Sequence, residues 1–122
     1  MGDNRVPRAV LGWERFKDWL SASVHLTHHE LHVLAGLALF IVSARLLRRP
    51  LRSVLPLVPV AVLELINEGS DFARYYTSGW PWTAHETLVD IALTLMPPFL
   101  LVCVMHVVAA GQAIGPDDPK QS

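Results

Sequence analysis

The chain has 122 residues, 52% of them hydrophobic and 17% charged, and its formal net charge is −1. This near-neutral balance gives no basis for expecting nucleic acid as a partner, and the single cysteine excludes an internal disulfide bond. The charges gather in short stretches and leave long apolar segments between them, which predicts a small, all-α integral membrane protein.

The first predicted element is an amphipathic helix within residues 1–23, after a short polar start. Ala9, Trp13, Phe16 and Leu20 recur at helical spacing and define one apolar stripe, while charged residues occupy the other faces. Because tryptophan favours the headgroup level of a membrane, this helix is expected to lie on the membrane surface. A soluble helix that packs on a partner is the alternative.

Three transmembrane helices are predicted to follow within residues 24–110, since a spanning helix needs about 20 mostly apolar residues. Their expected ranges are His29–Leu47, Leu51–Gly69 and Ala84–Ala110. Two prolines in the second span and two in the third predict kinks. An aromatic connector over residues 70–82 joins these two spans, and residues 111–122 are expected to form a disordered tail.

Polar side chains gather at one end of each predicted span. If one helix runs through them, four histidines at the start of the first span fall within an arc of about 100°. These are His25, His28, His29 and His32. The end of the second span repeats the spacing with Glu64, Asn67, Glu68 and Asp71, and the third span opens with His85, Glu86 and Asp90. Because successive spans run antiparallel, we expect all three clusters at the same membrane surface.

The chemistry of this polar cluster has three interpretations. One is a hydrogen-bonded network that ties the helices together. Another is a metal site, where histidine with carboxylate suits zinc, manganese or iron, and carboxylates alone suit magnesium. The last is a metal-free acid–base site on the deepest carboxylates, Glu64 and Asp90. The candidate metal ligands are His25, His28, His29, His32, Glu68, Asp71, His85 and Glu86, and the candidate catalytic residues are Glu64, Asn67 and Asp90.

The orientation in the membrane is predicted from basic residues near the ends of the spans. Arg45, Arg48, Arg49 and Arg52 crowd the turn between the first two spans, and such clusters favour the cytoplasm. The polar cluster would then face the periplasm. Three short spans bury little interior, so besides membrane lipids we expect a second copy of the chain or a larger membrane complex as partner.

The second half of the chain resembles the VanZ-like family of small bacterial membrane proteins. Glu64 and Asn67 match a glutamate with an amide three positions on, and Asp90 and Thr94 match an aspartate with a small polar residue four positions on. Asn67 stands where glutamine is usual in that family, and Thr94 where asparagine is usual. The resemblance implies a multi-pass protein of the bacterial inner membrane, whose polar site we expect to bind a metal ion or a lipid headgroup.

The architecture also resembles the bacterial integral-membrane diacylglycerol kinase, a chain of similar length with a surface helix and three spans. That resemblance implies Glu64 as base, Asn67 as its amide, Asp71 as magnesium ligand and Asp90 as the aspartate that opens the third span. Val89 stands where the kinase has a lysine, which removes a main partner of the ATP phosphates. A lipid kinase or lipid-phosphate enzyme is one alternative function. A non-enzymatic accessory subunit of a membrane complex is another.

Overall fold

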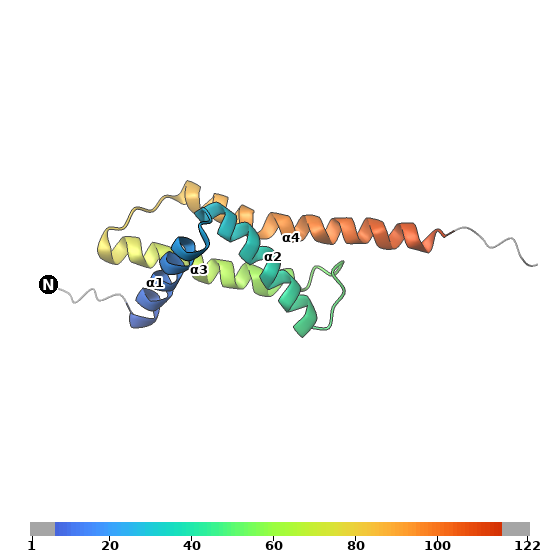
Figure 1. Cartoon of the computed structure of the whole chain (residues 1–122), viewed down its shortest axis with the longest axis horizontal. Helices are drawn as coiled ribbons and strands as arrows, with labels where there is room; N and C mark the ends of the chain where they lie inside the picture. Colours follow the sequence, from blue (N-terminus) through green and yellow to red (C-terminus); the bar gives the residue numbers. More distant parts are fainter. Residues whose placement is uncertain (1–6, 116–122) are drawn as a thin grey trace, which may run out of the picture.

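The structure, a computed structural model, describes residues 7–115 and contains four helices in this range (Figure 1). They are α1 (Arg8–Val24), α2 (His28–Leu46), α3 (Leu57–Ser78) and α4 (Ala84–Ala113). Residues 7–115 contain no strand, which confirms the all-α prediction. The predicted polar start up to residue 6 and the predicted disordered tail from residue 116 onward lie outside the described residues.

Threonine side chains set the starts of two helices. At α2, the Thr27 Oγ1 atom accepts the Glu30 backbone N–H at 3.2 Å, and the Glu30 Oε2 atom accepts the Thr27 backbone N–H at 2.7 Å. This reciprocal capping box satisfies two donors that a helix start leaves without partners. At α4, the Thr83 Oγ1 atom accepts the Glu86 backbone N–H at 3.1 Å. Both caps fix the helix turns on which the polar side chains of these two helices sit.

The range predicted for the second span, Leu51–Gly69, is wrong at both ends when compared with α3. Residues 51–56 form turns instead, with the Ser53 backbone N–H bonded to the Pro50 carbonyl at 2.9 Å. Pro59 falls in the first turn of α3, where a missing N–H costs no helical hydrogen bond. The helix then continues to Gly79, which ends it in the left-handed conformation at φ 68°. Most of the predicted connector is therefore helical, because nothing before Gly79 stops the helix.

The predicted four-histidine face is also wrong, because no helix runs through residues 25–27. His25 ends α1 in the left-handed conformation at φ 53°, and α2 begins only at His28. His28, His29 and His32 therefore lie in the first turns of α2, and His25 belongs to the preceding bend. The chain reverses direction there, which brings α1 across α3 (Figure 1).

Helices α2, α3 and α4 pack against one another, and α1 packs on α3 (Figure 1). A small apolar core of Phe40, Val60 and Val102 joins the three longer helices away from the polar end. Helix α2 approaches α4 closely at Gly36, where a Cβ atom would lie 2.1 Å from the Thr94 carbonyl oxygen. Glycine is therefore the residue that allows this helix pair to form, one turn from His32.

The burial pattern is the inverse of that in a water-soluble protein. Among the described residues, eight polar or charged side chains are buried and only four hydrophobic ones. Large apolar side chains instead cover the outside of every helix. In the described part of the chain, α2 and α4 are long and apolar enough to cross a membrane, and only 22% and 17% of their most apolar stretches are buried. Both stretches are therefore mostly exposed, whereas the core helix of a soluble protein is mostly buried.

Candidate functional site

A cavity of about 760 Å³ lies at the polar end of the molecule, lined by residues from all four helices. His28 and His32 reach it from α2, Glu64 from α3, and Asp90 and Thr94 from α4. Apart from His28, these side chains are buried. The structure therefore brings polar groups of these three helices together at one end of the bundle.

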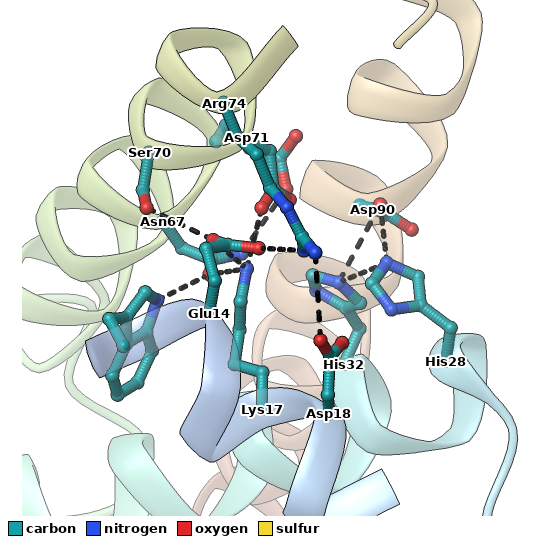
Figure 2. A network of polar contacts seen from close by, with 12 residues as sticks. Glu14, Lys17, Asp18, His28, His32, Asn67, Ser70, Asp71, Arg74 and Asp90 are labelled. Atoms are coloured by element: carbon teal, nitrogen blue, oxygen red, sulfur yellow. Dashed lines mark hydrogen bonds and ion pairs between the residues drawn. The ribbon is translucent and has the colours of Figure 1, made fainter. Parts of the chain in front are cut away.

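Three ligand-type atoms converge in this cavity, and they come from His28, His32 and Asp90 (Figure 2). The His28 Nε2 atom lies 3.0 Å from the Asp90 Oδ2 atom and 3.1 Å from the His32 Nε2 atom. The His32 Nε2 and Asp90 Oδ2 atoms are 3.6 Å apart. Two imidazole nitrogens at 3.1 Å must share a proton, or both must direct lone pairs at one cation.

Two oxygen atoms lie at the opposite edge of the His32 ring. The His32 Nδ1 atom lies 2.9 Å from the Thr94 Oγ1 atom and 3.2 Å from the Glu64 Oε1 atom. A carboxylate at this distance favours the proton on Nδ1, which leaves a lone pair on Nε2. With the proton on Nδ1, His32 can bind a metal through Nε2.

The Asp90 Oδ1 atom has no hydrogen-bond partner among the described residues, and its side chain is 4% exposed. The Glu64 Oε1 atom, on a side chain that is 6% exposed, lies beside the His32 Nδ1 atom at 3.2 Å. Glu68, also buried, adds a third carboxylate within 4.8 Å of His32 and Glu64. Buried anionic groups without donors are costly, so this arrangement favours a cation in the cavity.

A second polar network joins α1 to α3 at the rim of the cavity (Figure 2). The Lys17 Nζ atom lies 2.9 Å from the Glu14 Oε1 atom, 2.9 Å from the Asn67 Oδ1 atom and 2.6 Å from the Asp71 Oδ1 atom. Trp13 donates its indole N–H to the same Asn67 oxygen at 3.0 Å. Lys17 is therefore the common donor that holds α1 against α3.

Glu14 is the buried centre of this α1–α3 network. Its carboxylate accepts hydrogen bonds from Ser70 at 3.0 Å and from Arg74 at 2.9 Å. Burial alone would raise the pKa of Glu14, but hydrogen bonds with Asp71, Lys17 and Ser70 and the charge of Lys17 hold this pKa at about 2. Burial likewise opposes the charge on Lys17, yet the same two carboxylates raise its pKa above the usual value. Both groups are thus charged at neutral pH.

The remaining sequence-predicted site residues lie outside the cluster of His28, His32 and Asp90. The His29 Nε2 atom is 3.9 Å from the Asp90 Oδ1 atom, on a side chain that is 61% exposed. His25, His85 and Glu86 are exposed, and only Glu86 of these lines the cavity. Asn67 and Asp71 instead accept hydrogen bonds from side chains of α1.

Glu14 and Lys17 are the residues that the sequence analysis missed. They lie three positions apart on α1 and share one face, opposite the exposed Phe16 and Trp19. A buried glutamate on a surface helix has no signature in sequence, because its partners come from α3, more than 50 positions away. The sequence pattern revealed the aromatic stripe of this helix, whereas the contact with α3 uses the polar face together with the indole N–H of Trp13.

No family model, curated protein or solved structure matches the chain. The resemblance to VanZ-like proteins therefore stays a prediction. Three of the residues that carry it, Glu64, Asp90 and Thr94, surround the His32 ring at 3.2, 3.6 and 2.9 Å.

Proposed function

We propose that this protein is an integral membrane protein that holds one divalent metal ion through His28, His32 and Asp90. The observation that carries the proposal is the triangle of their ligand atoms, with sides of 3.0, 3.1 and 3.6 Å. Ligand atoms about 2.0–2.1 Å from a tetrahedral ion lie about 3.4 Å from one another, so little movement is needed to bind one. Two imidazoles and a carboxylate suit zinc, manganese or iron better than magnesium.

In this proposal, Glu64 and Thr94 orient the ring of His32. Metal-bound histidines usually donate their other N–H to a carboxylate, hydroxyl or carbonyl, which fixes the ring and strengthens the ligand. The positions of the Glu64 and Thr94 oxygens beside Nδ1 fit that role. A positive ion at Nε2 would also compensate the unpartnered Asp90 Oδ1 oxygen.

The proposed membrane arrangement has three spans, with α3 added to α2 and α4. Helix α3 carries Glu64 and Glu68, but both are buried against the other helices. Its outer face presents exposed apolar side chains, among them Val58, Val62 and Leu65, which suit lipid. Helix α1 would lie along the surface, its polar face on α3 and its aromatic face toward the headgroups.

The proposed location is the bacterial inner membrane with the cavity at the periplasmic surface. The arginines of the α2–α3 turn, Arg45, Arg48, Arg49 and Arg52, are all exposed at the end of α2 opposite His28. Residues 31–63 contain no acidic residue that could offset them. Basic clusters of this kind stay in the cytoplasm during insertion.

Metal analysis of the purified full chain tests the proposed function. After reconstitution with zinc, we expect about one equivalent per chain, lost in His28→Ala, His32→Ala and Asp90→Asn. The matched controls are His25→Ala and His85→Ala, which remove exposed histidines outside the cluster. A wild-type protein that takes up no zinc, manganese, iron or cobalt would refute the proposal. Loss of thermal stability in the three variants without any bound metal would instead support the hydrogen-bonded network, which is the role expected in an accessory subunit.

A further inference from the structure

The cavity at the polar end of the molecule carries an excess of negative charge. Its lining includes seven carboxylates but only two side chains of lysine or arginine, Lys17 and Arg74. Both of these cations are already engaged, because Lys17 contacts Glu14 and Asp71, and Arg74 contacts Glu14 and Asp18. Among the described residues, the other four carboxylates of the lining have no lysine or arginine partner.

These four carboxylates belong to Glu64, Glu68, Glu86 and Asp90. A divalent ion bound as proposed above would offset two of their four charges and leave two. It would bind the Asp90 Oδ2 atom, which faces the two histidines, whereas the Asp90 Oδ1 atom has no hydrogen-bond partner among the described residues. Because a buried anionic oxygen without a donor is costly, the cavity favours a further cation that brings N–H donors of its own.

Aromatic side chains in the same lining also suit a cation. Trp13, Trp80 and Trp82 line the cavity. The Arg74 guanidinium carbon lies 3.8 Å from the centre of the Trp80 ring, so one of these rings already carries a cation on its face. The face of an indole ring is electron-rich and attracts positive charge. The indole rings and the carboxylates therefore favour the same sign of ligand charge.

The cavity also has an apolar wall that continues onto the outer surface of the molecule. Leu63 and Ile66 of α3 and Phe16 of α1 line the cavity, yet they are 46%, 63% and 48% exposed. Leu31 and Leu39 of α2 line it as well and are half-buried. A ligand with an alkyl chain can therefore place its chain on this wall and its headgroup among the carboxylates.

We infer that the cavity binds an amphiphilic amine in its protonated form. The carboxylates that lack a lysine or arginine partner hold its ammonium group, and the wall that includes Leu31, Leu39 and Leu63 holds its alkyl chain. The inference goes beyond the proposed function, because the excess of carboxylates persists with or without a metal ion. A small free amine shares the headgroup chemistry, and the apolar wall favours the amphiphile.

The test measures how much radiolabelled dodecylammonium the immobilised full chain retains in a neutral detergent at pH 7, without added metal. Two unlabelled competitors separate charge from chain. Dodecyl phosphate has the same chain with the opposite charge, and methylammonium has the same charge without the chain. We expect each to displace the label only at a concentration at least about tenfold higher than unlabelled dodecylammonium, because each lacks one of the two contacts.

Variants of the full chain locate the binding. Glu68→Gln removes one of the carboxylates without a lysine or arginine partner and should weaken retention about tenfold. Its control is Glu30→Gln, which removes an exposed carboxylate outside the cavity and keeps a side chain that can cap α2. If Glu68→Gln does not fold, Ala35→Phe narrows the cavity wall from an exposed position, and Ala38→Phe, on the same helix but outside the cavity, is its control.

The outcomes separate this inference from the metal site. A chain that retains no more label than the resin in detergent alone overturns the inference and leaves the metal site standing. Retention of the label by a protein that takes up no metal supports the inference and refutes the metal site alone. Displacement by dodecyl phosphate or by methylammonium at the same concentration as by dodecylammonium overturns the inference, as does an equal effect of a cavity variant and its control.

Discussion

Gly36 of α2 faces the backbone carbonyl of Thr94 in α4 so closely that a Cβ atom would lie 2.1 Å from that oxygen. The carbonyl is free to face α2 because the helical N–H that would bond it belongs to position 98, which is a proline. The Thr94 hydroxyl meets His32 one turn away, at 2.9 Å. The close contact between the two backbones thus places Thr94 and Asp90 of α4 beside the histidines of α2.

Gly36→Ala is expected to separate α2 from α4 and to destabilise the protein. Overpacking at such a contact typically costs about 1–3 kcal/mol, and here the obstacle is backbone, which cannot rotate away. Thermal unfolding in detergent measures the effect. Gly69→Ala is the matched control, because nothing lies within 4 Å of its added Cβ and alanine favours the helix by about 1 kcal/mol. Equal stabilities of the two variants would contradict the assigned helix contact.

Glu64→Gln is expected to weaken metal binding by about 10- to 100-fold without abolishing it, the range typical of groups that orient a metal-bound histidine. The amide keeps the size of the side chain but loses the charge beside the His32 Nδ1 atom. Competition with a coloured chelator measures the affinity. Glu86→Gln removes an exposed carboxylate at the rim of the cavity and should leave the affinity unchanged. A full loss of metal in Glu64→Gln would make Glu64 a ligand instead.

Lys17→Met is expected to release α1 from α3, because it leaves Glu14 and Asp71 without their shared donor. Buried polar groups that lose their partner cost about 1–3 kcal/mol. Hydrogen exchange of residues 8–24 should therefore become faster. Arg15→Met removes the same charge from an exposed position of the same helix. In this variant, hydrogen exchange of residues 8–24 should be as slow as in wild type. Protection that is unchanged in Lys17→Met would show that other contacts hold α1.

Acid is expected to undock α1 through Glu14. The pKa of Glu14 is lowered from 4.5 to about 2 in the folded protein. Its contribution to the stability of the α1–α3 contact is therefore present above pH 4.5 and is lost as the pH falls toward 2. The pKa of Lys17 is raised above its usual value of 10.5. Its contribution to the stability of the same contact is therefore present below pH 10.5 and is lost as the pH rises through the raised pKa. Spin labels at positions 15 and 76 would report the separation of α1 and α3 across this range.

The matched variant for this pH dependence is Glu14→Gln, which cannot titrate at that position. Lys17 and Arg74 face Glu14 as positive charges, and Asp71 faces it as a second carboxylate. The label distance in Glu14→Gln should change less between pH 4.5 and 2 than in wild type. An identical pH profile in both proteins would exclude Glu14 as the titrating group.

The orientation in the membrane is expected to place the arginine-rich α2–α3 turn in the cytoplasm and the cavity in the periplasm. Single cysteines at positions 49 and 85, placed in a Cys103→Ser background because Cys103 is exposed, mark the two ends of the bundle. A membrane-impermeant maleimide added to intact cells should label position 85 and leave position 49 unlabelled until the cells are opened. The reverse pattern would place the cavity in the cytoplasm and contradict the periplasmic assignment.

The sequence by itself determined the helical class and the apolar segments, because helical period and hydropathy are local properties. It also placed Glu64 and Glu68 on one helix face and Asp90 and Thr94 on another, since side chains four positions apart share a face. Helix ends were less well determined. Helix α3 begins after Pro50 and Pro56 and not at Leu51, and it ends at Gly79 and not at Gly69 as the change in composition suggested.

Only the tertiary structure decided which polar groups meet. The bend at His25 removed one histidine from the predicted face, and the contact of Gly36 with Thr94 placed His32 beside Asp90, 58 positions further along the chain. It also decided that α1 packs through Glu14, Lys17 and the indole N–H of Trp13, while Trp19 stays exposed. The physical reason is that such contacts depend on how closely two backbones approach, and spacing within one helix carries no information about that distance.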